Sequence, residues 1–441
     1  METNHSSSSR VSFERISSAE ENNRGDVIGY NVLRIYHGGR DAAHRARDRA
    51  LVAAGHRVTL VMPTSWPEAE LVHDEPFELV PLAVRRPGDV NRHVFADARA
   101  LADVVRQVRP DVVDVHEEPF SAVTAQVLRT LGPGLPVVAY TAQNIDKRWP
   151  PPFAGHETRA YARLAGLHPC SSQAASVARG KGFRGRIDVI PLGVDAGLFT
   201  PGGQTADDAV FTLGVVGRLV EWKGVVDAVL AASAVRRVRR TRLLVVGDGP
   251  ERTHVLALAA SHGVDVEYHP WVEAAELAEL YRRMHVVLVP SRATRTWVEQ
   301  FGRVVPEARR CGAVVVATTC GSLPGVVGAT GVLVSEGSVA ELAAAVCGLA
   351  LDGGRWAQLR HAGLEVDATW DDVAVAVGAS YAHAVAGDRA DHAVGRPAAV
   401  AEFGPPATVT GGGRPFALPV LREDTRATRL LARTVDSVLA R

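Results

Sequence analysis

Lysine is scarce in this chain of 441 residues, because Lys147, Lys181 and Lys223 are the only three. Few residues could therefore bind the pyridoxal that a pyridoxal-dependent phosphorylase holds on a lysine, which disfavours that class of enzyme. Aromatic residues are also few, at 6 % of the chain. Basic and acidic residues balance at 49 each and no long basic tract stands out, so we expect no nucleic-acid partner.

Cysteines and long apolar runs are sparse as well. Cys170, Cys311, Cys320 and Cys347 show no CxxC spacing, which indicates a reduced interior without a metal site or a disulfide. No apolar run approaches the ~20 residues that a membrane helix needs, and the first residues lack the apolar stretch of a signal peptide. We therefore expect a cytoplasmic protein with no transmembrane segment, and peripheral membrane contact stays open.

Short apolar strands alternate with helices over two successive stretches of the chain, with a polar break after Pro201. This alternation predicts an α/β fold of two facing Rossmann-like, doubly wound domains with the active site in the cleft between them. The expected strands are 31–36, 56–62, 77–82, 111–115, 136–140 and 186–190 in the first stretch, and 210–216, 242–247, 264–268, 286–289, 313–317 and 331–334 in the second.

Two cations lie close together where the first strand of the second stretch ends. Arg218 leaves the strand after Gly217, and Lys223 stands just before Gly224, where we expect a helix to begin. The free N–H groups of a helix N-terminus add positive charge, so this junction predicts a diphosphate site. Taken alone, the spacing is also consistent with a turn that carries two solvated cations.

Two carboxylates follow a later strand of the same stretch. Glu299 and Glu307 flank Phe301 and Gly302, and Gly302 permits close backbone approach. We expect Glu307 in the first turn of a helix, where its carboxylate can accept hydrogen bonds from a ribose diol, and Glu299 near the hydroxyls of a sugar. Taken alone, Glu307 is also consistent with a helix cap and Glu299 with a solvated side chain. With the diphosphate site, they predict a nucleotide-sugar ligand.

Polar residues also follow three strands of the first stretch. The loop at Gly38 and Gly39 can approach a phosphate, although a plain turn explains it at least as well. His116 is expected at the sheet edge facing the cleft, where a catalytic and a structural role are about equally favoured. Gln143 and Asn144 can bind hydroxyls of a sugar or an acceptor, or merely cap a helix, and Glu117 and Glu118 are candidate acceptor-binding or base groups.

Together these motifs resemble those of the family 4 glycosyltransferases, which have the GT-B architecture. The resemblance covers about residues 30 to 384. One departure is Gly325, where family members often carry Glu, and another is the Gly-rich loop, which lacks a preceding Pro. The matching segments are Ala54-Gly55-His56-Arg57-Val58, Pro110-Asp111-Val112-Val113, Ile190-Pro191-Leu192-Gly193-Val194-Asp195, Gly217-Arg218-Leu219 with Lys223-Gly224, Val246-Gly247-Asp248-Gly249-Pro250, Pro290-Ser291 with Glu299-Gln300-Phe301-Gly302 and Glu307-Ala308, and Cys311-Gly312-Ala313-Val314-Val315.

The resemblance implies retaining transfer of a hexosyl group from a UDP- or GDP-sugar to a hydroxyl acceptor, in polysaccharide, glycolipid or secondary-metabolite biosynthesis. It implies no cofactor and no essential metal. It further implies that Arg218 and Lys223 hold the diphosphate, Glu307 the ribose and Glu299 the donor sugar, and that His116 faces the reacting centre. A nucleotide-sugar epimerase or hydrolase on the same architecture, or a non-catalytic nucleotide-sugar binding protein, stays open as an alternative.

The expected organisation has five parts. Residues 1–29 are expected to be disordered. Residues 30–201 form an N-terminal acceptor domain, 202–369 a C-terminal donor domain, and 370–386 a C-terminal crossing helix. Residues 387–441 are expected to be a low-complexity linker with a segment that can form a terminal helix.

Overall fold

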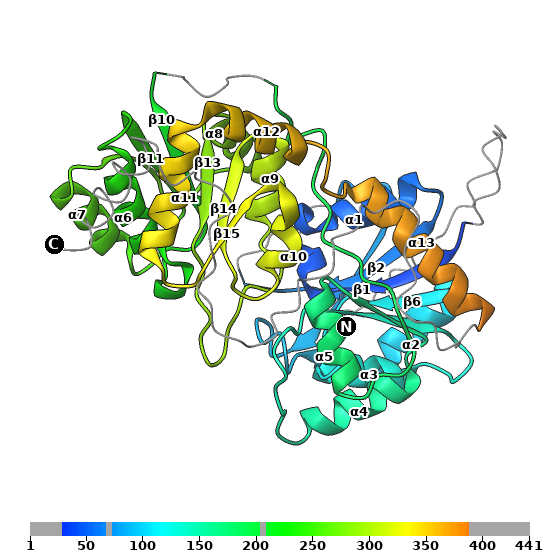
Figure 1. Cartoon of the computed structure of the whole chain (residues 1–441). Coiled ribbons are helices and arrows are strands. Elements are labelled where there is room, and N and C mark those ends of the chain that lie inside the picture. The colour runs from blue at the N-terminus through cyan, green and yellow to red at the C-terminus, as the bar shows by residue number, and fades with distance from the viewer. Residues whose placement is uncertain (1–28, 68–72, 203–208, 388–441) are drawn as a thin grey trace, which may run out of the picture.

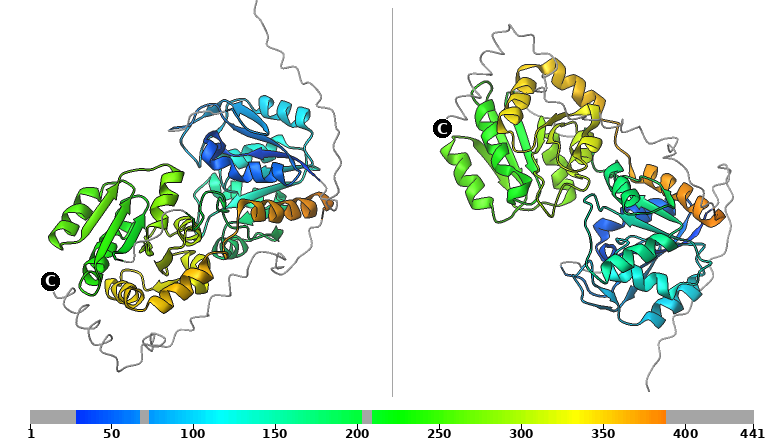
Figure 2. Two further views of the ribbon diagram at one scale, coloured as in Figure 1. Left: turned by 90° about the horizontal axis from the view of Figure 1, so that it is seen from above. Right: turned by 60° about the horizontal axis from the view of Figure 1, so that its bottom comes forward.

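The computed structural model describes residues 29–67, 73–202 and 209–387 of the chain. The expected disordered N-terminus up to residue 28, and the expected linker and terminal helix from residue 388, lie outside the described residues. Within the described part, two parallel β-sheets covered by helices form two lobes (Figure 1 and Figure 2). The α/β fold with two doubly wound units is therefore confirmed.

The first sheet has seven parallel strands in the order β3-β2-β1-β6-β7-β8-β9. Its inner strands are buried almost throughout, as expected of a parallel sheet with helices on both faces. Strand β8 (Gly166–Pro169) was not predicted, because its residues Gly-Leu-His-Pro contain a single aliphatic side chain and form no apolar run. The other strands are β1 (Asn31–Ile35), β2 (Arg57–Pro63), β3 (Glu78–Leu82), β6 (Val112–Val115), β7 (Val137–Thr141) and β9 (Arg186–Ile187).

A short antiparallel pair follows β3 in the same lobe. It consists of β4 (Val84–Arg85) and β5 (Val94–Phe95), and the loop between them carries the buried His93. The side-chain amide of Gln126 bonds both the N–H and the carbonyl of Phe95, at 2.8 and 2.9 Å. This pairing fixes the loop against the helix that carries Gln126.

Three α-helices of the first lobe begin at polar caps. The side chains of Asp97, Ser121 and Ser171 each accept a hydrogen bond from a backbone N–H in the first turn of a helix, which satisfies donors that the helix itself leaves free. The helices are η1 (His37–Arg40) and η2 (Ala42–Arg45), both of the 3-10 type, then α1 (Ala46–Ala53), α2 (Ala98–Val108), α3 (Ala122–Thr130), α4 (Phe153–Arg163) and α5 (Ser172–Gly180).

The second sheet has six parallel strands in the order β12-β11-β10-β13-β14-β15. All six strands predicted for this half are present within a residue or two of their expected ends. They are β10 (Phe211–Val216), β11 (Thr241–Val246), β12 (Asp265–His269), β13 (Val286–Val289), β14 (Val314–Thr318) and β15 (Val332–Val334). The helices are η3 (Glu221–Lys223), α6 (Val225–Val235), α7 (Arg252–Ser261), α8 (Ala274–Arg282), α9 (Val304–Arg310), α10 (Leu323–Val327), η4 (Gly328–Thr330), α11 (Val339–Leu351) and α12 (Gly353–Gly363).

The last described helix, α13 (Trp370–Ala386), returns from the second lobe to the first. It lies beside α1, as the orange helix of Figure 1 shows, and Val373, Val377 and Tyr381 complete a core cluster with side chains of the first sheet. The Tyr381 hydroxyl donates a hydrogen bond of 2.6 Å to Asp114 of β6. The chain therefore passes between the lobes twice.

All four cysteines are free and buried. Among the described residues, no helix combines the length and the apolar character that crossing a membrane requires.

Candidate functional site

Two adjoining cavities lie where the lobes face each other. The Lys223 cavity, of about 320 Å³, is lined mainly by the second lobe, and the His116 cavity, of about 370 Å³, mainly by the first. Five residues line both cavities: Tyr140, Ala142, Leu192, Gln300 and Arg303. A ligand that reaches from one cavity into the other would therefore contact both lobes.

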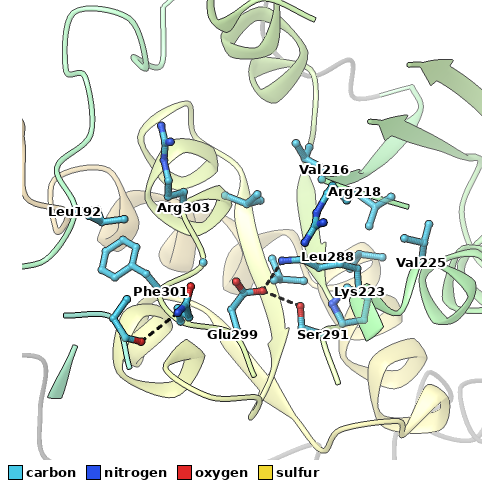
Figure 3. Close-up of a pocket in the computed structure, with 18 of the residues that line it drawn as sticks. Leu192, Val216, Arg218, Lys223, Val225, Leu288, Ser291, Glu299, Phe301 and Arg303 are labelled. Carbon is cyan, nitrogen blue, oxygen red and sulfur yellow. Dashed lines mark hydrogen bonds and ion pairs between the residues drawn. The ribbon is translucent and has the colours of Figure 1, made fainter. Parts of the chain in front are cut away.

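The cationic junction forms one wall of the Lys223 cavity (Figure 3). After β10, Gly217 has a φ of 135°, and Arg218 leaves the sheet with an exposed side chain that forms no hydrogen bond or ion pair with another described residue. Lys223 ends η3, and Gly224 caps α6 with a φ of 66°. A Cβ at Gly224 would lie 2.1 Å from the carbonyl oxygen of Pro290, so this junction requires glycine.

Lys223 and Glu299 form an ion pair inside this cavity. The Lys223 Nζ lies 2.6 Å from Glu299 Oε2, and the Ser291 hydroxyl donates a 3.0 Å hydrogen bond to the same oxygen. The ammonium group also lies 5.1 Å from the centre of the Trp297 ring. An anion that binds Lys223 must share it with Glu299 or displace that carboxylate, because the two side chains already neutralise each other.

The turn after Glu299 completes the wall opposite the cations. Phe301 is buried at 6 % exposure, and Gly302 has a φ of 84°; both line the Lys223 cavity. Close by, a Cβ at Gly321 would lie 2.2 Å from the carbonyl oxygen of Glu299. The backbone of this turn is therefore packed tightly enough to fix the direction of the Glu299 side chain.

Glu307 lies in the first turn of α9, as the sequence predicts, but it does not line the Lys223 cavity. Its carboxylate accepts a 3.2 Å hydrogen bond from the Tyr281 hydroxyl and lies 3.5 Å from the Arg303 guanidinium. Burial raises the pKa of Glu307, although Arg303 and Tyr281 oppose the change. The side chain keeps 12 % exposure, and its assignment to a ribose stays a prediction.

His116 lies on the wall of the other cavity, between two aromatic rings. It stacks on Tyr140 at 4.1 Å and meets Tyr36 edge-on at 4.4 Å. The Arg47 guanidinium, which can only donate, lies 3.0 Å from Nδ1, so the ring proton is on Nε2. Burial, followed by Arg34 and Arg47, lowers the pKa of His116 well below its usual value. His116 is therefore a neutral imidazole whose Nε2–H can donate a hydrogen bond.

The two carboxylates that follow His116 have different partners. Glu117 accepts hydrogen bonds from the backbone N–H of His37 at 2.7 Å and from its ring at 2.8 Å. Glu118 accepts from the Thr141 hydroxyl at 2.7 Å and the Ala142 N–H at 2.8 Å. Burial raises the pKa of Glu118 to about 7, against the effect of these two donors. Both side chains line the His116 cavity.

The other predicted residues of the first lobe lie outside both linings. The side chain of Gln143 bonds Glu157 and Trp149. Asn144 instead crosses to the second lobe, where its amide donates a 2.7 Å hydrogen bond to the backbone carbonyl of Glu299. Gly38 and Gly39 form part of η1, and a Cβ at Gly38 would lie 2.5 Å from the Tyr36 ring.

Several residues of the two cavities were not predicted. Arg303 lines both cavities and directly follows Gly302, so its position in the motif was a signal that could have been used. Ser291 was noted as part of a motif, but its bond to Glu299 was not foreseen. Arg47 and Tyr36 carried no local signal, because an arginine in a helix and a tyrosine at a strand end are usually structural.

Fold and site together define a GT-B glycosyltransferase architecture. Sucrose-phosphate synthase from Thermosynechococcus elongatus has the same fold, with a TM-score of 0.65 and 19 % identity over 80 % of this chain and 99 % of that one. The Anabaena protein HepE, solved in complex with UDP and glucose, gives a TM-score of 0.59 and 17 % identity over 80 % and 99 % of the two chains.

The sequence comparisons narrow this class to a family. The model described as Glycosyltransferase Family 4 matches residues 49–198, and the one described as Glycosyl transferases group 1 matches residues 210–352. The two models together span more than half of the chain, one in each lobe. The protein belongs to the group 1, family 4 glycosyltransferases.

Curated relatives of this chain carry the name D-inositol 3-phosphate glycosyltransferase. The one from Segniliparus rotundus is 35 % identical over 221 residues, 46 % of this chain and 48 % of the relative. The one from Mycolicibacterium smegmatis is 34 % identical over 232 residues, 49 % of this chain and 51 % of the relative. The chain thus spans about half the length of the curated relatives that it matches.

Proposed function

We propose that this protein transfers a hexosyl group from a nucleoside diphosphate sugar, a UDP- or GDP-sugar, to an acceptor hydroxyl with retention of anomeric configuration. The observation that carries the proposal is the Lys223 cavity, where Arg218, the ion pair of Lys223 with Glu299 and the start of α6 surround a space that adjoins the cavity of the other lobe. Membership of the family supports the reaction type. The HepE complex supports UDP as the nucleotide of at least one protein with this fold.

In this proposal, Arg218 and Lys223 bind the diphosphate and stabilise the negative charge that develops on it as the glycosidic bond breaks. Glu299 then exchanges Lys223 for hydroxyls of the donor sugar, and Ser291 keeps the carboxylate in place. Burial raises the pKa of Cys170, which also lines the cavity, to about 11, so it is a thiol near neutral pH and a weak nucleophile. We assign retention to front-face attack assisted by the departing phosphate.

The acceptor is proposed to bind in the His116 cavity. His116 lines this cavity and has an Nε2–H that can donate a hydrogen bond, and its ring stacks on Tyr140, which lines both cavities. Arg303 also lines both cavities, so its guanidinium is a donor at the boundary, where an acceptor hydroxyl would meet the donor sugar. The pathway we propose is the synthesis of a polysaccharide, a glycolipid or a secondary metabolite. The names of the relatives make D-inositol 3-phosphate one acceptor to include in a panel.

The proposal predicts that Lys223→Ala reduces transfer by about 100- to 1000-fold, because it removes one donor to the developing charge. Transfer is measured by product formation from a panel of UDP- and GDP-sugars, and folding by thermal unfolding. Lys181→Ala is the matched control, because Lys181 pairs with Glu157 at 2.9 Å outside both cavities. Near-normal turnover of Lys223→Ala would contradict the assignment.

Product analysis separates transfer from the alternatives. Free sugar formed equally with and without an acceptor indicates a hydrolase, and an isomerised nucleotide-sugar indicates an epimerase. Binding of a nucleotide-sugar that raises the unfolding temperature, without turnover across the acceptor panel, indicates a binding protein.

A further inference from the structure

A buried carboxylate in the first lobe lacks an Arg or Lys partner. Glu117 is 4 % exposed, and among the described residues its ion-pair partners are two histidines. His37 Nδ1 lies 2.8 Å from both of its carboxylate oxygens, and His93 Nε2 lies 3.9 Å from Oε1. A buried carboxylate needs compensating positive charge, and a neutral imidazole does not supply it.

The fold brings these three side chains together from separate segments. β1 and β6 are neighbours in the sheet, with Ile35 paired to Val115, so the residues that follow their carboxyl ends lie level with each other. His37 and Glu117 occupy these positions, and His93 comes from the loop that enters β5. One ligand atom from each of the three lies within 4.8 Å of the other two.

His93 is already held in the state that a metal ligand requires. Its Nδ1 lies 3.1 Å from the carbonyl oxygen of Asp89, which can only accept, so Nδ1 carries the proton and the lone pair is on Nε2. A backbone carbonyl that fixes the second nitrogen is the usual support of a metal-bound histidine.

We propose that His37, His93 and Glu117 form a site for a divalent transition-metal ion of the Zn²⁺ class. Two imidazole nitrogens and one carboxylate are a ligand set that zinc accepts, with a fourth position left for a water or a substrate oxygen. The gaps of 2.8 and 3.9 Å bracket the distance of about 3.3 to 3.5 Å between ligands of a tetrahedral ion. His37 and Glu117 line the His116 cavity, so the fourth position faces that cavity.

The proposed ion has a role separate from that of the diphosphate site. It compensates the charge of Glu117 and ties the loop before β5 to the ends of β1 and β6, which shapes the wall of the His116 cavity. The Nδ1 of His37 lies against both oxygens of Glu117, so binding of the ion through this nitrogen requires the tautomer in which Nε2 carries the proton.

Direct titration of the untagged full-length chain tests the site without any assay of turnover. We expect one Zn²⁺ per chain with micromolar or tighter affinity, and one Co²⁺ with the visible absorption of tetrahedral coordination. The Trp66 ring lies 4.8 Å from His37 and 5.0 Å from His93, so Co²⁺ should quench its fluorescence, and Trp66→Phe should lose that change.

Substitutions assign the ligands. His93→Gln and Glu117→Gln should each weaken Zn²⁺ binding by more than about 10-fold, the lower limit for loss of even an outer partner of a metal site. His44→Gln is the matched control, because His44 lines the same cavity outside the cluster and should leave affinity unchanged. The proposal is overturned if the unmodified chain binds neither ion at micromolar concentration, or if binding survives both ligand substitutions.

Discussion

The charges around the two cavities are held in different ways. In the Lys223 cavity, Arg218 is exposed, and Lys223 keeps 26 % exposure while it pairs with Glu299. In the wall of the His116 cavity, which Arg47 lines, the pair of Arg47 and Asp114 is buried, with side chains that are 6 % and 0 % exposed. Side chains that bind an anionic ligand must be able to exchange one charged partner for another, whereas a buried ion pair in a cavity wall can keep the same partner throughout.

The buried network explains why the wall stays fixed. Arg47 bonds Asp114 at 2.7 Å, and Arg34 bonds Asp48 at 2.8 Å. Burial opposes ionisation of Asp114, but Arg47 and Arg34 outweigh that effect, so its pKa is lowered. Tyr381 of α13 supplies a further hydrogen bond to Asp114. The outermost member of the network is His116, through the bond from Arg47.

The largest effect is expected where this network is broken. Arg47→Ala leaves Asp114 with less compensation for its buried charge, so the free energy of unfolding should fall by about 3 to 5 kcal/mol. Denaturant unfolding measures the change. Arg106→Ala is the matched control, because Arg106 and Asp103 pair on the surface with 72 % and 53 % exposure, and it should cost under about 1 kcal/mol. If both variants lost the same free energy of unfolding, the buried ion pair would contribute no more to stability than the surface pair, contrary to this prediction.

A second test uses the pH dependence of Glu118. Burial raises its pKa from 4.5 to about 7, so between these values the folded state retains a proton that the unfolded state has released. The stability that this carboxyl contributes is full below pH 4.5 and is lost as the pH rises to about 7. The thermal unfolding temperature of the wild-type protein should therefore fall relative to that of Glu118→Gln across this window. If the unfolding temperatures of the two proteins changed with pH in the same way, the pKa of Glu118 would not be raised, and the side chain would be more solvated than in the structure.

The smallest effect is expected at the contact between the lobes. Asn144→Ala removes the 2.7 Å hydrogen bond to the Glu299 backbone and a longer one of 3.3 Å to the Ser322 hydroxyl. We expect kcat/KM to fall by about 5- to 10-fold, the value of one ordinary hydrogen bond. Gln173→Ala is the control, because its amide oxygen meets Asn144 and Ser322 only at 3.5 and 3.4 Å and makes no bond to Glu299. A loss as large as that expected for Lys223→Ala would mean that Asn144 takes part in donor binding directly.

The second lobe could be predicted from the sequence in detail. Its strands are apolar runs with clear ends, and Arg218, Lys223 and Glu299 follow those ends at the spacing of known junctions. The parallel order of the strands then brings the three side chains to one edge of the sheet. Their partners were harder to foresee: Lys223 and Glu299 were assigned to different parts of a donor, and the structure pairs them with each other.

The first lobe was less predictable, because its important contacts join residues far apart in the chain. The sequence around Arg47 does not predict its contact with Asp114, and the sequence around His93 does not predict its contact with Glu117. Asn144 was expected to contact an acceptor, whereas in the structure its side chain bonds the backbone of Glu299 in the other lobe. Such a contact depends on how the two lobes are placed relative to each other, which no local sequence pattern indicates. Glu307 was placed correctly in its helix, yet the packing of Tyr281 against its carboxylate has no sequence pattern.

The path of the chain limits how this protein can be recombined with its relatives. Since α13 belongs to the core of the first lobe, that lobe is built from two pieces separated by the whole of the second. A chimaera that exchanges the acceptor half therefore needs two crossover points, one between Phe199 and Phe211 and another between Gly363 and Trp370. A single-junction hybrid would set a foreign helix against α1, and its failure would reflect mismatched packing rather than incompatible chemistry.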